Sequence, residues 1–373
     1  MERIRAEMAE DENNRPLNRP YYQQTMRAWS LLLTPWRAAG GYLLIGLIFV
    51  PLGAFLWGDA DSIVEMRRQY DGENAAEPDC MISTYRADKN CNISFEVTED
   101  IPGTAYVYYE LSNFYQNHAT YVASVDQSQL LGSTSTSSID DNCTPLIYNG
   151  SLVLHPCGLI ANTLFNDIFT VTSGQFMDET DIAWDSDVAD KFVQPDGFES
   201  TDCDASFTEC QACLENAELT DSDGGTDFSG CGFEDVNGTQ YAYYYPNEDT
   251  TQYLYETFPE VISPLVGVKD EHFIVWMRTS GLSKFRKLYG RIEGGLAKGD
   301  TLTFEVTANF IVDYYNGTKS LVVSNTGDLG GKMSYWAQSM TTVGIVVLVL
   351  ALILAVKYKV APRVMGDITK LLD

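Results

Sequence analysis

The stretches GYLLIGLIFVPLGAFLW, at residues 41–57, and TTVGIVVLVLALILAV, at residues 341–356, decide the fold of this 373-residue chain. Each is the core of an uncharged segment of about 20 residues, and an α-helix of that length crosses roughly 30 Å of hydrocarbon. A helix in the core of a soluble protein would carry a polar face, and neither segment has one. The sequence therefore predicts two transmembrane helices, at residues 38–57 and 336–356.

Basic residues flank both spans on the same side. Six arginines precede the first span, and Lys357, Lys359, Arg363 and Lys370 follow the second. Basic flanks remain on the cytosolic side. The first span also lacks the small-residue cleavage site of a signal peptide. We therefore expect cytosolic tails at residues 1–37 and 357–373, and a lumenal or extracellular domain at residues 58–335.

The segment between the spans is strongly acidic. It holds 14 of the 24 basic residues and 45 of the 52 acidic residues, which leaves a formal charge of −31. Such a surface is soluble and repels nucleic acid and anionic headgroups. We therefore expect no nucleic-acid partner.

Cysteines and glycosylation sequons occur only between the spans. An even number of cysteines on the oxidising side predicts disulfides. The sequons predict N-glycans, and the one at Asn142 is the weakest because Cys143 is its middle residue. The cysteines are Cys80, Cys91, Cys143, Cys157, Cys203, Cys210, Cys213 and Cys231, and the sequon asparagines are Asn92, Asn142, Asn149, Asn237 and Asn316.

The segment between the spans has mainly the pattern of β-strands. Apolar and polar residues alternate through TLTFEVTANFIVDYY, residues 301–315, which places one set on a core face. Asn316-Gly317 predicts a turn, with residues 320–323 as the returning strand of a hairpin. Residues 92–97 and 104–110 are further candidate strands, and residues 282–292 have weak helical periodicity. We predict a mainly antiparallel β-sandwich with short helices.

Residues 197–237 differ from the rest of the domain. They are polar and acidic and contain four cysteines, Cys203, Cys210, Cys213 and Cys231. We interpret them as an insertion held by its own disulfides, because crosslinks replace a core in such segments. The alternatives are a tetrahedral zinc site and a redox Cys210-x-x-Cys213 pair, which lacks a thioredoxin-like context. The oxidising compartment favours disulfides.

No catalytic machinery is recognisable. His155 and Cys157 in HPCG suggest a Cys–His nucleophile, but a disulfide is the more economical interpretation of Cys157. The chain has no phosphate-binding P-loop, no dinucleotide fingerprint and no nucleophile elbow. The spans carry no ionisable residue, which argues against conduction. Gly41, Gly46 and Gly53 instead predict close packing against the helices of another protein.

Several motifs resemble the cell division control protein 50 family, also called the transmembrane protein 30 family. Its members are non-catalytic β-subunits of type IV P-type ATPases, the phospholipid flippases. The matching stretches are the residues before the first span (Pro16, Asn18, Gln23, Gln24, Ala28 and Trp29), GLIFVPLG at 46–53, LSNFYQNHATYVASVDQSQLLG at 111–132, PCGLIANTLFND at 156–167, FIVWMRTSGLSKFRKLYGRI at 273–292 and Gly330-Gly331-Lys332.

The resemblance implies a heterodimer with a type IV P-type ATPase catalytic subunit in a lipid membrane. It implies the disulfides Cys80–Cys91 and Cys143–Cys157, no enzymatic activity of the chain itself and no cofactor. It also implies that the complex needs this subunit to leave the endoplasmic reticulum, for the Golgi, endosomal or plasma membrane. Two departures stand out: Asn166-Asp167-Ile168 lacks the family's sequon, and residues 197–237 have no assignable counterpart.

Two other classes of protein can have the same membrane topology. A two-span ion-channel subunit would need a polar stripe along its spans, and a cell-surface receptor with a cysteine-rich ectodomain would not need the motifs next to the membrane. Both features argue for the flippase subunit.

Overall fold

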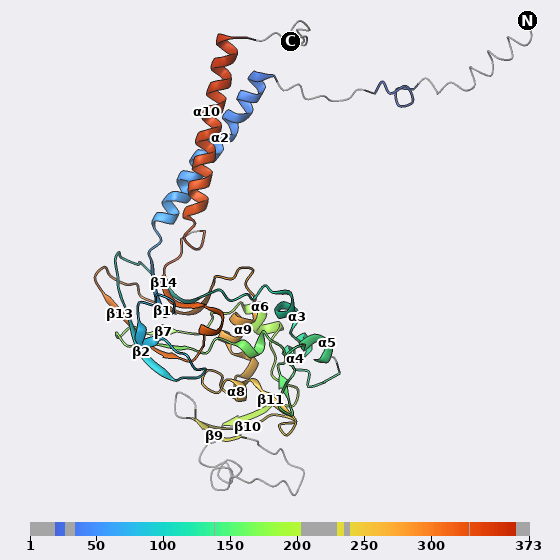
Figure 1. Ribbon diagram of the computed structural model, residues 1–373, viewed down its shortest axis with the longest axis vertical. Coiled ribbons are helices and arrows are strands. Elements are labelled where there is room, and N and C mark those ends of the chain that lie inside the picture. Colours follow the sequence, from blue (N-terminus) through green and yellow to red (C-terminus); the bar gives the residue numbers. More distant parts are fainter. Residues whose placement is uncertain are drawn as a thin grey trace, which may run out of the picture. The chain divides into compact units, whose positions relative to one another are not determined.

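The computed structural model describes residues 19–26, 34–137, 139–202, 230–234, 239–327 and 329–362. The chain divides into two compact units. The first, a helical unit, is formed by Met1–Gly58 and Met333–Asp373. The second, the ectodomain, is formed by Asp59–Lys332. Figure 1 shows that the helical unit contains two long helices and that the ectodomain contains the strands.

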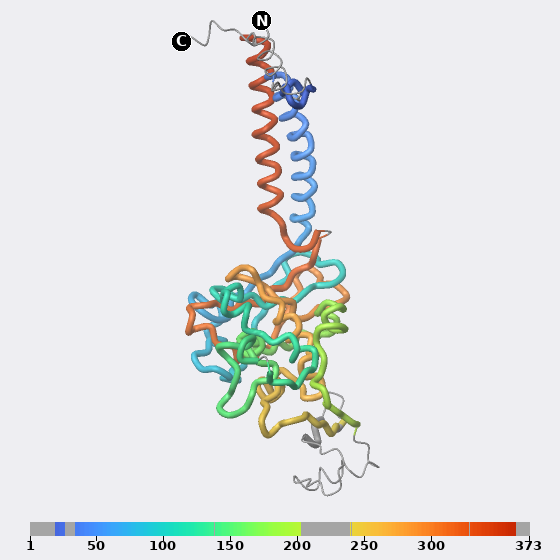
Figure 2. Tube along the Cα trace, turned by 90° about the vertical axis from the view of Figure 1, so that its right-hand side faces the viewer, coloured from blue at the N-terminus to red at the C-terminus, as the bar shows by residue number. Residues whose placement is uncertain are grey.

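Both predicted spans lie within longer helices. Helix α2 covers Pro35–Asp61 and helix α10 covers Ser334–Val360, and each has 27 residues. Both are long and apolar enough to cross a membrane. Figures 1 and 2 show the two helices side by side.

The glycines of α2 pack against the chain's own second helix. A Cβ atom added to Gly46 would lie 2.4 Å from Cγ of Leu348, and one added to Gly53 would lie 2.8 Å from the backbone nitrogen of Thr341. The prediction that these two glycines face the helices of another protein was therefore wrong. Among the described residues, no atom lies within 4 Å of a Cβ atom added to Gly41, so this glycine is still available for such a contact.

Two antiparallel sheets form the centre of the ectodomain. One has the strand order β1-β14-β3-β12-β7 and the other β2-β13-β6. The strands are β1 (Glu65–Gly72), β14 (Thr318–Ser324), β3 (Ala105–Ser112), β12 (Phe285–Ile292), β7 (Met177–Asp178), β2 (Lys89–Glu96), β13 (Thr301–Ala308) and β6 (Ile168–Val171). Their inward faces share one hydrophobic core. The predicted β-sandwich with short helices is confirmed, as are the strands expected at 92–97 and 104–110.

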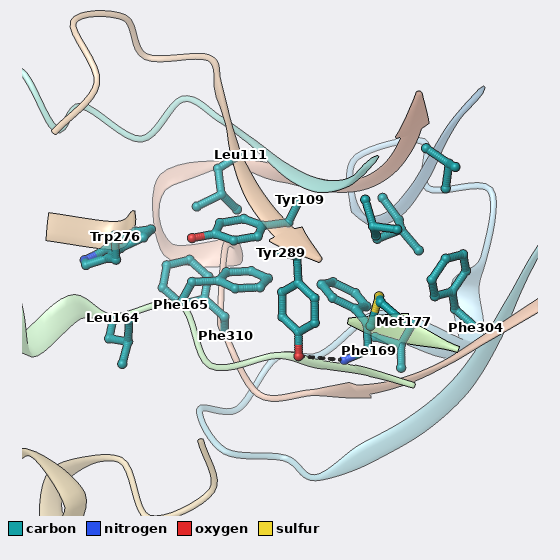
Figure 3. Packing of buried hydrophobic residues seen from close by; sticks show 14 of the residues in the cluster. Tyr109, Leu111, Leu164, Phe165, Phe169, Met177, Trp276, Tyr289, Phe304 and Phe310 are labelled. Carbon is teal, nitrogen blue, oxygen red and sulfur yellow. Dashed lines mark hydrogen bonds between the residues drawn. The ribbon is translucent and has the colours of Figure 1, made fainter. Parts of the chain in front are cut away.

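Aromatic rings fill the core between the sheets (Figure 3). The Tyr109 and Phe165 rings stack with centroids 3.9 Å apart. Phe169 meets the Tyr289 ring edge to face at 4.8 Å, and its backbone N–H donates to the Tyr289 hydroxyl at 3.2 Å. Large buried rings contribute most of the apolar area that stabilises such a core. The two sheets therefore pack against one shared core.

The expected hairpin after residue 315 does not form. β13 ends at Ala308, and β14 pairs with β1 and β3 in the other sheet. The reason is Asp167, whose Oδ1 accepts the N–H groups of both Asn309 and Phe310 at 2.6 Å. A carboxylate there takes the place of a neighbouring strand. The chain then crosses between the sheets through η4 (Asp313–Tyr315) and Asn316, which has a positive φ of 52°.

The weak helical pattern at 282–292 was also misleading. Residues Phe285–Ile292 form strand β12, paired with β3. The helix lies earlier, as α9 (Glu271–Met277), where the Asp270 carboxylate accepts the Phe273 N–H at 3.1 Å. Lys287 of β12 then donates to the carbonyl of Val275 at 2.9 Å and so satisfies the end of this helix.

Short elements complete the ectodomain. They are η1 (Pro78–Cys80), α3 (Ala119–Ala123), α4 (Gln127–Leu130), α5 (Ile139–Cys143), β4 (Tyr148–Asn149), β5 (Leu152–His155), η2 (Ala161–Thr163), α6 (Asp185–Asp190), β8 (Glu199–Asp202), β9 (Gly230–Glu234), β10 (Gln240–Tyr244), β11 (Thr251–Tyr253), α8 (Leu254–Thr257) and η3 (Gly267–Lys269). β8 and β9 both pair with β10, so a small sheet joins the two ends of the expected insertion. Cys203, Cys210 and Cys213 lie outside the described residues. The disulfides expected for this insertion, and the zinc and redox alternatives, depend on these cysteines and stay predictions.

Candidate partner-binding surface

The three ectodomain motifs lie against one another in the fold. The Trp276 indole N–H donates to the Ile160 carbonyl at 2.9 Å. The Ser280 N–H donates to Gln116 Oε1 at 2.8 Å, which joins the first motif to the third. These bonds link segments separated by more than 100 residues of sequence, so the motifs build one structural region.

Phe114 is the apolar centre of this region. Its ring lies within 6.2 Å, centroid to centroid, of five others: Tyr121, Trp276, Phe285, Phe310 and Tyr315. Rings at such distances pack favourably beyond the area that they bury. The buried residues of the motifs therefore hold the region rigid, and their exposed neighbours are the candidates for binding.

Three loops meet at the edge of this region. The Phe114 N–H donates to the Ser283 carbonyl at 3.1 Å, and the Asn117 amide donates to the Gly281 carbonyl at 2.9 Å. The Asn113 side chain donates to the carbonyl of Tyr315. Hydrogen bonds thus join the loops after β3, before β12 and before β14 into one rigid edge.

Each of these loops exposes one large apolar side chain. The exposed fractions are 57% for Tyr115, 72% for Leu282 and 82% for Tyr314. We call these three residues the loop-tip surface. Exposed apolar groups on a preorganised backbone lower the ordering cost of binding a protein. The sequence did not predict this grouping, although Leu282 between Gly281 and Ser283 was a usable signal, because turn residues on both sides favour exposure.

A network of ion pairs lies on the sheet beside the third motif. The Glu110 carboxylate, only 3% exposed, accepts Arg67 Nε at 2.6 Å, Arg286 Nε at 2.9 Å and Lys284 Nζ at 3.2 Å. Burial alone would raise the pKa of Glu110, but the hydrogen bonds from Arg286 and Arg67 outweigh it and lower that pKa. Arg286 also bonds Glu65 at 2.7 Å. These charges are satisfied within the protein.

The last residue of the second motif, Asp167, belongs to a buried polar cluster. Its Oδ2 accepts the Tyr70 hydroxyl at 2.8 Å and the Lys319 ammonium at 2.8 Å. Lys319 also pairs with Asp71 at 3.1 Å, and burial raises the pKa of Asp71. Buried charges of this kind need partners. Here they brace the crossover between the sheets.

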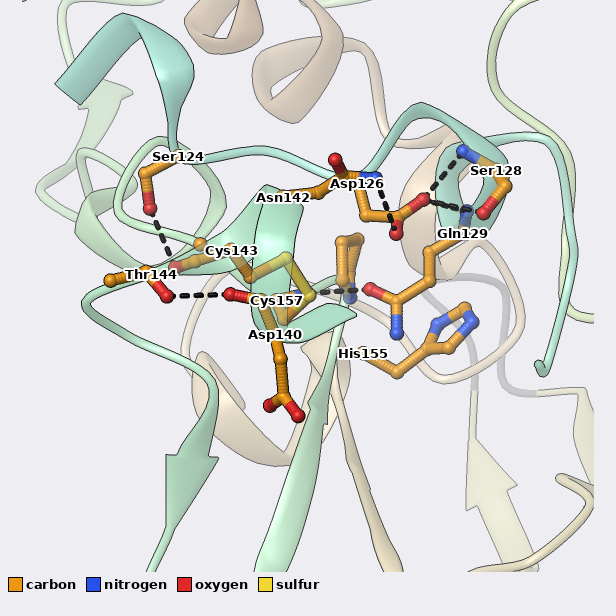
Figure 4. The surroundings of a disulfide bond; sticks show 12 residues. Ser124, Asp126, Ser128, Gln129, Asp140, Asn142, Cys143, Thr144, His155 and Cys157 are labelled. Carbon is orange, nitrogen blue, oxygen red and sulfur yellow. Dashed lines mark hydrogen bonds between the residues drawn. A yellow bond between two sulfur atoms is a disulfide. The ribbon is translucent and has the colours of Figure 1, made fainter. Parts of the chain in front are cut away.

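Two disulfides occupy the positions that the resemblance implied. Cys80 bonds Cys91, and Cys143 bonds Cys157 with their Cα atoms 5.6 Å apart. Figure 4 shows the second bond next to Gln129, whose Oε1 accepts the Cys157 N–H at 2.8 Å.

The disulfide excludes Cys157 as a nucleophile. The neighbouring His155 is buried and pairs with the Ser133 carbonyl at 3.1 Å. Among the described residues, no group of three or more His, Cys, Asp or Glu is arranged to hold a metal ion. His118 lies before α3, where the exposed side chain contributes to no cluster of that kind.

The described sequon asparagines are all exposed. Asn92 lies on β2, Asn149 on β4 and Asn316 in the turn after η4. Asn142 is exposed as well, but its amide donates to Asp126 Oδ2 at 3.2 Å. Asn237 lies outside the described residues.

Two apolar helices and a disulfide-bonded β-sandwich define a two-pass membrane protein with one large folded domain. The protein-family model described as the LEM3 (ligand-effect modulator 3) family / CDC50 family matches residues 56–364 of this chain. The chain therefore belongs to this family, which confirms the resemblance of its motifs.

Similar proteins cover almost the whole chain. ALA-interacting subunit 3 of Arabidopsis thaliana is 31% identical over 370 residues, which are 96% of this chain and 90% of that protein. Cell cycle control protein 50A of Mus musculus is 31% identical over 361 residues, 92% of this chain and 88% of that protein. The phospholipid-transporting ATPase accessory subunit CRF1 of Saccharomyces cerevisiae is 27% identical over 391 residues, 95% of this chain and 88% of that protein.

Proposed function

We propose that this chain is the non-catalytic accessory subunit, or β-subunit, of a type IV P-type ATPase that transports phospholipids. The observation that carries the proposal is the likeness, over 95% of the chain, to a protein named as a phospholipid-transporting ATPase accessory subunit. The relative named as an ALA-interacting subunit supports the same role. The proposal covers three effects on the ATPase: its folding, its exit from the endoplasmic reticulum and its lipid transport.

The ectodomain has the properties that this role needs. Its core is densely aromatic, and hydrogen bonds fix the loops that carry Tyr115, Leu282 and Tyr314. A rigid surface loses little conformational entropy when it binds. We propose that the loop-tip surface contacts the ATPase.

We further propose that both termini are cytosolic and that the ectodomain is lumenal or extracellular. The basic residues beyond α10 and before α2 support this orientation. The complex would reside in the endoplasmic reticulum, Golgi, endosomal or plasma membrane. Disulfides within the ectodomain fit a compartment that is oxidising.

Co-purification tests the partnership directly. The tagged chain is expressed with each type IV P-type ATPase of a host, and complexes are isolated in mild detergent and identified by mass spectrometry. We expect one ATPase to co-purify in a stoichiometric complex and to gain ATP-dependent lipid transport. We also expect both proteins to leave the endoplasmic reticulum only when they are expressed together. Failure of every ATPase to co-purify, with both proteins localised as when expressed alone, would refute the proposal.

A further inference from the structure

One sequon asparagine lies beside the loop-tip surface. Asn316 begins the sequon Asn316-Gly317-Thr318 and follows Tyr314, the most exposed of the three loop-tip residues, by two positions. Two residues of chain span at most about 7 Å. A standard interface buries roughly 800 Å² on each partner, which corresponds to a disc of about 16 Å radius. An interface centred near Tyr314 therefore includes Asn316.

The turn that carries Asn316 is fixed by the rest of the fold. The Asn316 N–H donates to the Asp313 carbonyl at 3.2 Å. A Cβ atom added to Gly317 would lie 2.8 Å from the Ser112 carbonyl oxygen, so the turn packs directly on β3. A shift of the loop therefore cannot carry Asn316 away from Tyr314.

The Asn316 side chain is available for modification. It is exposed and makes no hydrogen bond with any residue that the structure describes. The Asn149 amide, by contrast, donates to Gln252 at 2.8 Å. A glycan on the Asn316 amide nitrogen would extend from the turn into the solvent that a partner has to displace.

The folded chain does not present this sequon for glycosylation. Thr318 is the first residue of β14, and its hydroxyl lies 2.7 Å from the Ser112 hydroxyl. Its backbone is paired with Gly72 of β1 and with Ser112 of β3. Since an oligosaccharyl transferase has to bind the sequon hydroxyl, any glycan on Asn316 is added before β14 joins the sheet.

We propose that an N-glycan on Asn316 prevents the ATPase from binding, so that the chain enters the complex only when Asn316 is unmodified. The inference rests on the proposed function and on the loop-tip surface as the contact. A glycan is bulky and hydrated, and the apolar centre of an interface has to exclude water. Competition between glycan transfer and the pairing of β14 then determines how much chain can assemble.

The transfer is the ordinary reaction at a sequon. The donor is a dolichyl diphosphate oligosaccharide. The bond between C1 of its first sugar and the phosphate oxygen breaks, and C1 forms a bond to Nδ2 of Asn316. The amide loses one proton, and dolichyl diphosphate leaves.

Glycan occupancy in bound and unbound chain tests the inference. The full-length chain is expressed with the ATPase that co-purifies with it, and the complex and the unbound chain are separated in mild detergent. Peptide N-glycosidase in heavy-oxygen water converts each occupied asparagine to labelled aspartate, which mass spectrometry counts. Asn316 occupancy should be at least about tenfold lower in the complex, the effect of losing one interface hot spot. Asn149 occupancy should be equal in the two pools.

Two substitutions reduce the glycan in different ways. Asn316→Asp removes the acceptor amide and keeps a residue that tolerates positive φ. Thr318→Ser keeps the hydroxyl beside Ser112 but makes a poorer sequon. Asn316→Asp should raise the apparent affinity for the ATPase in inverse proportion to the unmodified fraction of wild type, about twofold if half is glycosylated. Thr318→Ser should raise it by a smaller factor.

Asn149→Asp is the matched control. It removes a glycan and adds the same charge on β4, which belongs to none of the three loops, and it should leave co-purification unchanged. An equal gain from Asn149→Asp and Asn316→Asp would show a general effect of glycan or charge and overturn the inference.

Two further results separate this inference from the proposed function. Equal occupancy of Asn316 in the two pools, or no glycan on Asn316 in either, would overturn the inference and leave the proposed function intact. Failure of every ATPase to co-purify with Asn316→Asp as well as with wild type would refute the proposed function and this inference with it. Equal thermal unfolding midpoints for all variants would show that the fold is retained.

Discussion

At the scale of single residues, the polar groups of the ectodomain are placed by their need for partners. Asp167 both ends strand β13 and pairs with Lys319, so one carboxylate determines a change of sheet and neutralises a buried cation. Glu110 gathers three basic side chains on the outside of the other sheet. The Asp167–Lys319 pair stabilises the core, and the Glu110 network links strands on the outer face of its sheet.

We expect Lys319→Met to destabilise the protein strongly. Lys319 has no exposed surface, and its loss leaves the Asp71 and Asp167 carboxylates buried without their cation. Breaking a buried pair in this way costs about 3–5 kcal/mol, which corresponds to a fall of roughly 10 °C in the unfolding midpoint. Thermal unfolding of the detergent-purified chain, followed by near-ultraviolet circular dichroism, measures it.

Lys284→Met is the control for that substitution. The Lys284 side chain is 58% exposed, so its pair with Glu110 is screened by water and contributes less than about 1 kcal/mol. A similar midpoint for both variants would contradict the structural role of Lys319.

The lowered pKa of Glu110 predicts a loss of stability in acid. The folded-state pKa lies below the ordinary value of 4.5, so the contribution is complete above pH 4.5 and is lost as the pH falls through the folded pKa. We expect the difference in unfolding midpoint between wild type and Glu110→Gln to be largest at pH 6 and to narrow at pH 3.5. The exposed Glu293→Gln is the control, and a difference that does not vary with pH would disprove the assignment.

At the scale of elements, loops and helices differ in what they leave available for a partner. The loops that carry Tyr115, Leu282 and Tyr314 are rigid and expose apolar side chains. The glycine face of α2, by contrast, is occupied by α10. Binding outside the membrane is therefore expected to depend on the loops, whereas Gly46 and Gly53 keep the two helices together.

We expect Leu282→Asp to weaken binding to the ATPase. If the loop-tip surface is a contact, a charge buried within it should reduce co-purification at least about tenfold, as at an interface hot spot. Phe176→Asp is the matched control, because Phe176 is 81% exposed and lies outside this surface. Equal co-purification of the two variants, with equal unfolding midpoints, would remove these loops from the interface.

Substitution at Gly53 should separate the two helices. A leucine there would collide with the Thr341 backbone, whereas a leucine at Gly41 has open space. Pulsed electron paramagnetic resonance between spin labels at Leu43 and Leu352 should give a longer or broader distance distribution in Gly53→Leu. Gly41→Leu should match the parent protein, and a change in both variants would argue against close contact at Gly53.

At the scale of the whole molecule, orientation and glycosylation are linked. Asn92, Asn149 and Asn316 are exposed and belong to the domain that we place on the lumenal side. We expect several of these asparagines, together with Asn237, to carry N-glycans. Glycosidase treatment should therefore increase gel mobility by more than the mass of one glycan.

Single substitutions assign each glycan. Each Asn→Gln change at an occupied sequon should remove one step in mobility, while Asn142→Gln should leave it unchanged, because Cys143 within that sequon is already bonded. Absence of any shift would argue against both the glycans and the proposed orientation.

Local composition was enough to predict several features of the protein. Two uncharged apolar segments predict two spans because the hydrocarbon thickness sets their length. Alternation predicts strands β2, β3 and β13 because successive side chains point to opposite faces. Unbroken motifs likewise identified the family without any knowledge of the fold.

The way in which these elements pack together could not be predicted from local patterns. Alternation of apolar and polar residues does not show which strands are neighbours in a sheet. Asp167 lies more than 140 residues from the end of β13 in sequence, yet its hydrogen bonds end β13, and β14 then pairs in the other sheet. The pattern at 282–292 was read as helical, yet pairing with β3 makes residues 285–292 a strand. The same reason applies to the glycines of α2 and to the loop-tip residues. The close approach of a glycine and the exposure of a side chain both depend on which segments pack beside them, and contacts between residues distant in sequence determine that packing.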